Sequence, residues 1–235
     1  RAREARLNAF DQFVTEIDGL DIHFIHQRSA NPDALPLLIS HGWPGSIVEF
    51  AKVIGPLTRD FHVVCPTLPG FGFSGKPAAA GWSVERIALA WDTLMKRIGY
   101  DRYGAQGGDW GAAVTTQIGR NRQGCIGIHL NMPIAAPVGD LGDPSPDERE
   151  ALAARKHYER WEAGYSKQQA TRPQTLGYGL ADSPVGQLAW IVEKLCAWSD
   201  CDGHPENIFS RDEMLDDVML YWATNSGASS ARIYW

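Results

Sequence analysis

The chain has 235 residues, of which 44% are apolar and 21% charged, and its formal net charge is −6. That length is enough for one domain with a large apolar core, or for such a core with an inserted segment. A net negative chain offers no basic surface, so we expect neither nucleic acid nor an anionic membrane as a partner. No apolar run approaches the roughly 18 residues that span a bilayer, and no signal peptide opens the chain.

The first half of the chain alternates strand and helix signals. Residues 13–17 and 21–26 alternate apolar and polar positions around Asp18-Gly19, which predicts a β-hairpin. The wholly apolar run 35–39 is typical of a strand that a parallel sheet covers on both faces. Further strands are predicted at 62–66, 103–105 and 125–130, and helices at 46–54, 83–98 and 112–118. This alternation predicts a doubly wound α/β sheet.

The character of the chain changes near Pro133. Residues 135–146 are rich in proline and aspartate and are typical of a linker. Beyond them the sequence predicts helices at 147–161, 183–198 and 210–223, and no strand. We therefore divide the chain into an N-terminal α/β core, residues 1–138, and a helical lid, residues 139–235.

Two helix starts in these halves have the spacing of a capping box. Ser46 precedes Glu49 by three residues, and Ser210 precedes Glu213 by the same interval. In a capping box the serine hydroxyl and the glutamate carboxylate satisfy backbone N–H groups of the first helical turn. We therefore expect continuous helices to begin at both serines.

The four cysteines do not form a recognisable framework. Only Cys196 and Cys201 lie close together in the sequence, and they lack a second pair at a spacing that would bind zinc. We expect reduced thiols in a cytoplasmic protein, no metal site and no cofactor.

The segment Gln106 to Gly111 has the pattern Gly-x-Asp-x-Gly, with Asp109 at its centre. In a nucleophile elbow, this turn between a strand and a helix exposes the central side chain at the sheet edge. A carboxylate in that position can displace a leaving group at a saturated carbon and form an alkyl ester, which water then hydrolyses. Taken alone, the motif is more typical of a glycine-rich turn with a capping aspartate.

Further motifs reduce the weight of that alternative. Beside the elbow, these motifs are His41-Gly42-Trp43-Pro44-Gly45-Ser46, the segment from Leu68 to Pro77, His129-Leu130-Asn131-Met132-Pro133, and Ala181-Asp182-Ser183-Pro184-Val185-Gly186. In this order they resemble the epoxide hydrolases, and most closely the microsomal-type branch. The resemblance extends over residues 7–234 and implies an α/β-hydrolase fold with an inserted helical lid.

The resemblance also implies roles for residues near the elbow. Asp109 is expected to be the nucleophile, and the backbone N–H groups of Trp43 and Trp110 are expected to form an oxyanion hole. Pro44 is expected to follow a cis peptide bond. His41 is expected to shape the site rather than transfer a proton, and the segment from Leu68 to Pro77 is expected to be structural.

Two lid tyrosines complete the site that the resemblance implies. Tyr165 follows Gly164, and Tyr234 ends the segment that begins at Ser229. A phenol with a pKa near 10 keeps its proton at neutral pH and can donate it to the oxygen of an opening epoxide. Sequence physics alone does not select these two from the seven tyrosines of the chain.

The second half of the reaction has no candidate base in this sequence. The resemblance places the family's histidine and its orienting acid beyond the lid, together with the last two strands of the sheet. Asn131, where some relatives carry the acid, cannot act as one. We therefore expect this chain to be part of a longer enzyme, with a small apolar epoxide and water as substrates. A role in detoxification or in aromatic hydrocarbon catabolism, and a homodimer, are left open.

Two other functions stay open at this point. A haloalkane dehalogenase shares the fold and the ester intermediate, but it binds halide through indole or amide N–H groups instead of a tyrosine pair. Trp43 and Trp110 are compatible with that function, whereas the lid motifs oppose it. A non-catalytic hydrolase-fold protein that only binds ligand, or a truncated remnant of an enzyme, is the second alternative.

Overall fold

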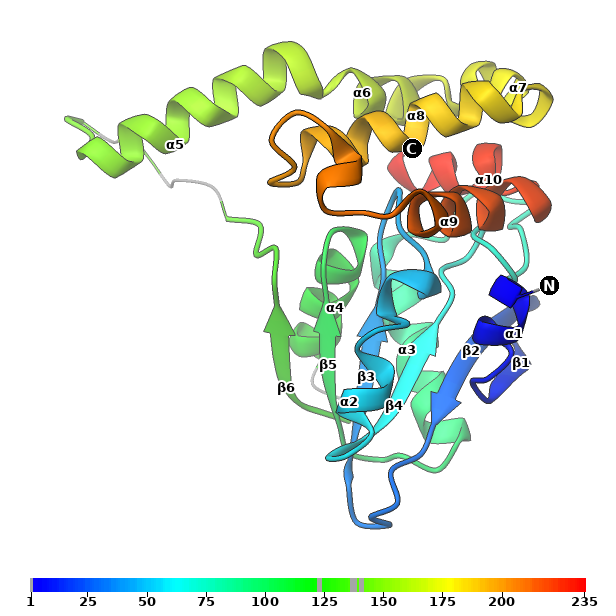
Figure 1. Cartoon of the computed structure of the whole chain (residues 1–235). Coiled ribbons are helices and arrows are strands. Elements are labelled where there is room, and N and C mark those ends of the chain that lie inside the picture. The colour runs from blue at the N-terminus through cyan, green and yellow to red at the C-terminus, as the bar shows by residue number, and fades with distance from the viewer. Residues whose placement is uncertain (1, 122–123, 136–138, 140–141) are drawn as a thin grey trace.

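The structure is a computed structural model that describes residues 2–121, 124–135, 139 and 142–235. Its centre is a six-stranded sheet in the order β1-β2-β4-β3-β5-β6 (Figure 1). The strands are β1 (Gln12–Ile17), β2 (Leu20–Gln27), β3 (Leu35–Ser40), β4 (Phe61–Pro66), β5 (Tyr103–Gly107) and β6 (Cys125–Leu130). The expected α/β sheet is thus confirmed within these residues.

The two halves of the sheet differ in strand direction. β1 and β2 form the expected antiparallel hairpin, and its turn residues Asp18 and Gly19 both have positive φ. β2 also pairs antiparallel with β4. The pairs β3–β4, β3–β5 and β5–β6 are parallel. The carboxyl ends of these parallel strands therefore meet at one edge of the sheet.

Alternate residues of the central strands bury apolar side chains on opposite faces of the sheet. In β4, Val64 packs into one cluster with Trp91, whereas Val63 and Cys65 pack into a second cluster with Ile54. The first face is covered by α3 (Val84–Arg97) and α4 (Trp110–Asn121), and the second by α1 (Ala2–Leu7) and α2 (Ile54–Leu57). The central strands β3 and β4 are therefore covered on both faces, as their apolar sequences predict, whereas the edge strands β1 and β6 are largely exposed.

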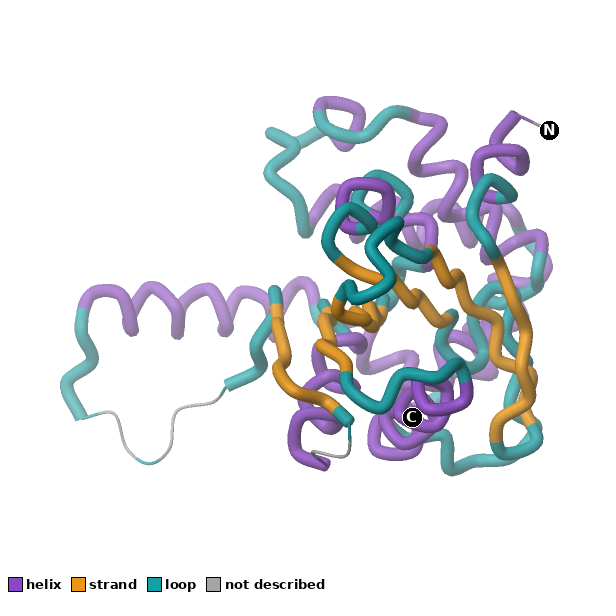
Figure 2. The backbone as a smooth tube through the Cα atoms, turned by 90° about the horizontal axis from the view of Figure 1, so that it is seen from below, coloured by secondary structure: helices purple, strands orange, loops and turns teal. Residues whose placement is uncertain are grey.

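A group of helices lies over the carboxyl ends of the parallel strands (Figure 1). They are α5 (Pro146–His157), a π-helical turn (Tyr158–Glu162), α6 (Gly164–Thr171), α7 (Pro173–Asp182), α8 (Pro184–Ala197), α9 (Arg211–Ala223) and α10 (Gly227–Ala231), followed by the 3-10 turn Arg232–Tyr234. Seen from below, α5 projects past the β6 edge, and none of its residues is buried (Figure 2). Among the helices of the described segments, none is long and apolar enough to cross a membrane.

The sequence predicted too few helices in the lid, namely three. The structure adds α6, α7 and α10, which the sequence did not indicate because glycines and Pro173 interrupt the helical pattern there. Packing supplies the missing stability: a side chain at Gly177 of α7 would lie 2.6 Å from the Cβ of Ala228 in α10. Most of a helix's stability comes from such tertiary contacts rather than from propensity. The short α1 was also not predicted.

The continuous helix expected at 46–54 was wrong. The structure has a 3-10 turn (Ile47–Phe50) followed by the four-residue α2, which contains Gly55 and Pro56. The Ser46 hydroxyl accepts from the Val48 N–H and donates to Asp217, so no capping box with Glu49 forms. The second expected box, Ser210 with Glu213, is confirmed at the start of α9.

The expected linker lies only partly within the described residues. Residues 136–138 and 140–141 are outside them, and the proposed boundary between core and lid falls on this stretch. All four cysteines are free thiols, with the sulfurs of Cys196 and Cys201 3.7 Å apart.

Candidate active site

Asp109 occupies the turn between β5 and α4, at the edge of the sheet that the helical group covers. Its φ is +52°, a left-handed conformation that residues other than glycine seldom adopt. The turn is close to its neighbours: a Cβ at Gly107 would lie 2.0 Å from the carbonyl oxygen of Gly111, and one at Gly111 would lie 2.0 Å from that of Ser40. Both flanking glycines are therefore required, as in a nucleophile elbow.

Backbone donors hold the Asp109 carboxylate. The Trp43 N–H donates to Asp109 Oδ1 at 2.7 Å, and the Trp110 N–H also bonds to this carboxylate. The Trp43–Pro44 peptide bond is cis, as expected. At Gly42, a Cβ would lie 2.2 Å from Asp109 Oδ1, so only glycine lets the loop approach the carboxylate this closely. The structure thus brings together the nucleophile and the two oxyanion-hole donors that the sequence predicted.

Two opposing effects set the pKa of Asp109. Burial raises it above the usual aspartate value, while the hydrogen bonds from the Trp43 and Trp110 N–H groups lower it. Burial is the larger effect, and it acts by disfavouring the charged form. A partly desolvated carboxylate is also a stronger nucleophile, because fewer water molecules must leave before it attacks.

The two predicted tyrosines converge on the elbow from different elements. Tyr165 comes from α6 and stacks on the Trp43 indole, with ring centroids 5.1 Å apart and planes at 10°. Tyr234, from the C-terminal 3-10 turn, packs edge-on against Trp110 at 4.8 Å. The Tyr165 and Tyr234 rings are 5.7 Å apart. Residues 165 and 234 are thus neighbours in space and lie beside the indoles that flank Asp109.

The two phenol groups differ in their hydrogen bonds. The Tyr234 hydroxyl is buried and makes no hydrogen bond of good geometry with a described residue, although the Trp110 and Tyr165 side chains lie near enough to lower its pKa. The Tyr165 hydroxyl lies 3.2 Å from that of Tyr158. Burial raises the pKa of Tyr165, and the Tyr158 hydrogen bond acts in the same direction. Burial also raises the pKa of Tyr234, followed by the negative charge of Asp109. Both phenols therefore carry their protons at neutral pH, and the Tyr234 proton has no acceptor of good geometry among the described residues.

The histidine in the Trp43 loop is structural, as expected. His41 Nε2 accepts from the Leu68 N–H at 3.1 Å, and its Nδ1 lies 3.0 Å from the carbonyl oxygen of Gly42. Burial lowers the pKa of His41 to about 4, so its ring is neutral at pH 7. Through these hydrogen bonds, His41 connects the loop of residues 41–45, called the Trp43 loop, to the segment from Leu68 to Pro77.

The remaining histidines are engaged elsewhere or lie on the surface. In the core, His23 bonds to Thr67, His26 to Tyr100, and His62 to the Ser29 N–H. His129 is exposed on β6, His157 ends α5, and His204 precedes the 3-10 turn Pro205–Asn207 between α8 and α9. Among the described residues, no histidine hydrogen-bonds to Asp109 or to either tyrosine.

Sequence reasoning missed several residues around this site. Trp198 packs edge-on against Tyr165 at 5.1 Å, and the Lys194 ammonium lies 4.9 Å from the same ring. Asp217 is buried and accepts from the Ser46 hydroxyl at 2.7 Å. Lys194 could have been noticed, because it shares a helical face with Gln187 and Ile191, and all three are buried.

Two family models match this chain. The model of the epoxide hydrolase N terminus matches residues 1–50, and that of the α/β hydrolase fold matches residues 36–165. The chain therefore belongs to the α/β-hydrolase fold family, and its N-terminal segment is similar to that of the epoxide hydrolases.

Similar curated proteins are named epoxide hydrolases. A protein of Stigmatella aurantiaca, whose epoxide hydrolase name is itself provisional, is 52% identical over 248 residues, covering 100% of this chain and 56% of that protein. Epoxide hydrolase 1 of Oryctolagus cuniculus is 37% identical, covering 97% of this chain and 58% of its own length. The chain thus spans little more than half of these relatives.

Solved structures agree with the fold. The epoxide hydrolase of Aspergillus niger superimposes with a TM-score of 0.90 at 37% identity, covering 100% of this chain and 62% of that one. The juvenile hormone epoxide hydrolase of the silkworm Bombyx mori gives 0.89 at 35% identity, covering 99% and 62%. The expected resemblance to epoxide hydrolases is confirmed.

Proposed function

We propose that this chain carries the ester-forming half of an epoxide hydrolase, with Asp109 as the nucleophile. The observation that carries the proposal is the convergence of unlike groups at one strand end. Asp109, bound by two backbone N–H groups, lies beside a pair of protonated phenols, and the Tyr234 proton has no acceptor of good geometry among the described residues. A buried donor without a partner is costly, so it indicates a place for a ligand acceptor.

The first step follows from this arrangement. A carboxylate oxygen of Asp109 attacks an epoxide carbon, and the bond between that carbon and the epoxide oxygen breaks. Its electron pair stays on oxygen, which accepts a proton or a strong hydrogen bond from Tyr165 or Tyr234. The product is a hydroxyalkyl ester of Asp109.

Hydrolysis of the ester needs a water molecule and a base to activate it. We propose that water attacks the Asp109 carbonyl carbon while the Trp43 and Trp110 N–H groups stabilise the oxyanion, and that a vicinal diol leaves. The four buried histidines make other contacts, and no described histidine bonds to Asp109 or to either tyrosine, so we propose none of them as this base. On the 235-residue chain alone, the ester should therefore persist.

The substrate class follows from the walls of the site. Trp43, Trp110 and Trp198 surround the tyrosine pair, so the site offers aromatic surface around a few polar groups. We propose a small apolar epoxide as the substrate. The cytoplasmic location, the homodimer and the division at residue 138 stay predictions, which cell fractionation, sedimentation and limited proteolysis test.

Incubation with styrene oxide and, separately, with a haloalkane tests the proposed function. The intact mass of the chain should rise by the full mass of styrene oxide, since ring opening releases no group. The haloalkane, which would lose halide on alkylation, should give no adduct. An adduct from the haloalkane alone supports a dehalogenase, and a folded chain that gains neither adduct supports a binding protein or remnant.

A further inference from the structure

Lys194 is a buried, charged residue on helix α8. The proposed reaction steps do not use it. It lies on the face of α8 that also buries Gln187 and Ile191, and its side chain is only 5% exposed. Lysine is seldom buried, because removing an ammonium from water is costly unless other groups replace its hydration. Its surroundings therefore indicate a specific role.

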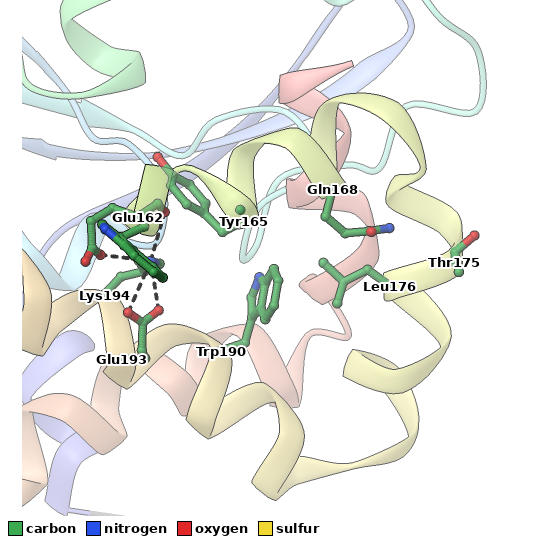
Figure 3. Close-up of a pocket in the computed structure, with 10 residues that line it drawn as sticks. Glu162, Tyr165, Gln168, Thr175, Leu176, Trp190, Glu193 and Lys194 are labelled. Carbon is green, nitrogen blue, oxygen red and sulfur yellow. Dashed lines mark hydrogen bonds and ion pairs between the residues drawn. The ribbon is translucent and has the colours of Figure 1, made fainter. Parts of the chain in front are cut away.

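Two glutamates at the rim of a hollow anchor the ammonium. Lys194 Nζ lies 2.8 Å from the Glu193 carboxylate and 3.6 Å from that of Glu162, and it donates to the Glu162 carbonyl oxygen at 3.2 Å. The hollow has a volume of about 620 Å³, and Tyr165 and Trp190 also line it (Figure 3). The Glu193 side chain is 57% exposed, so water screens much of its charge.

Aromatic rings replace water around the same ammonium. Nζ lies 4.9 Å from the centroid of the Tyr165 ring and 5.5 Å from that of Trp198. Trp198 in turn packs edge-on against Tyr165, which stacks on Trp43. Lys194 therefore contacts the ring of a proposed proton donor, on an aromatic stack that leads to the Trp43 loop.

We propose that Lys194 is a positioning residue that acts through Tyr165, fixing its ring and stabilising the charge that this ring gains as its hydroxyl donates to the epoxide oxygen. This inference rests on the proposed function. As the donor proton moves toward the alkoxide, the phenol acquires phenolate character, and the attraction of a nearby cation to the ring grows. An interaction that is stronger in the transition state than in the bound state raises the rate of the step rather than the affinity.

The test is the rate of adduct formation on the 235-residue chain with styrene oxide. Lys194→Met keeps the aliphatic stem and removes the charge. It should lower the rate at saturating epoxide by about tenfold and leave the half-saturating concentration nearly unchanged, as expected for one desolvated cation–π contact. Lys194→Arg keeps a cation over the ring and should restore the rate to within about threefold.

A double-mutant cycle separates this role from packing. In a Tyr165→Phe background the ring remains but cannot donate, so Lys194→Met should change the remaining rate by less than about twofold. An equal loss in both backgrounds, or no loss in the first, overturns the role of Lys194. If the unmodified chain forms no adduct, the proposed function fails first, and this role fails with it.

A second variant keeps the test usable if Lys194→Met does not fold. Glu193→Gln removes the nearer, exposed carboxylate and leaves Glu162 to hold the ammonium. With less of its charge neutralised, Lys194 should raise the rate about twofold when Tyr165 is present and leave it unchanged with Phe at that position. A rate that falls or does not change when Tyr165 is present contradicts the inference.

Discussion

Asp109 is held in a conformation that costs energy. A φ of +52° in a residue with a Cβ is strained by roughly 1–3 kcal/mol, and the glycines on either side leave no room for other backbone paths. In this conformation the carboxylate accepts a hydrogen bond from the Trp43 N–H. The position therefore favours presentation of one side chain at the strand end over stability of the turn.

The tyrosine pair gives the first residue-scale prediction. Tyr165→Phe and Tyr234→Phe should each lower the rate of adduct formation by about 100-fold, because each removes a proton donor from the leaving oxygen. Tyr178→Phe is the matched control: Tyr178 is 69% exposed, and its substitution should leave the rate unchanged. If both single variants alkylate as fast as the unmodified chain, the phenols are packing residues only.

The second residue-scale prediction concerns how the rate of Asp109 alkylation depends on pH. Only the carboxylate form of Asp109 attacks, so the rate should fall as the pH drops through its pKa. Because burial raises that pKa, the loss should have its midpoint above the usual aspartate value. On the alkaline side the rate should be level to about pH 9, since both phenols have raised pKa values. Adduct rates across this range, corrected with Asp109→Asn, check the profile, and a midpoint at or below the usual value contradicts it.

At the scale of elements, helix α9 joins the core through a buried carboxyl group. Asp217 is 8% exposed, receives the Ser46 hydroxyl on one oxygen, and has no partner among the described residues on the other. Burial raises its pKa to about 7, and the Ser46 hydrogen bond only partly opposes this. Folding thus favours the protonated form of the Asp217 carboxyl group, relative to the unfolded chain.

This contact predicts a stability change with a defined sign. Because the folded pKa exceeds the unfolded one, the stability that protonated Asp217 contributes is present below about pH 4 and is lost as the pH rises to about 7. Asp217→Asn should therefore raise the free energy of unfolding by about 2 kcal/mol at pH 8 and change it little at pH 4. Thermal unfolding at both pH values measures it.

The adjacent Asp216 provides the control for that measurement. It lies on the same helix, is partly exposed and pairs with Arg3. Asp216→Asn should give no gain at pH 8. An equal gain from both substitutions would point to the general charge of the helix rather than to burial of Asp217.

The elements that the sequence predicted are those with strong local signals. The hairpin at Asp18-Gly19, the apolar strands and the capped start of α9 all formed as expected. Helices α6, α7 and α10 escaped prediction because contacts distant in sequence, such as Gly177 against Ala228, stabilise them. Helix propensity depends only on the local sequence and therefore does not reflect such contacts.

At the scale of the whole molecule, the site was only partly predictable because its residues come from distant parts of the sequence. The elbow motif identified Asp109, and family resemblance identified Tyr165 and Tyr234, which lie far apart in sequence and adjacent in space. Lys194 and Trp198 enter the site only because the helical group folds over the strand ends (Figure 1). No spacing within one segment encodes that arrangement.

The central claim is that Asp109 becomes esterified by an epoxide. The most direct measurement is tandem mass spectrometry of peptides from the chain after treatment with styrene oxide, with Asp109→Asn treated in parallel. We predict one modified peptide, with the added mass of the intact epoxide on Asp109, and no modification in the variant. An adduct on another residue, or an equal adduct in Asp109→Asn, would contradict the account.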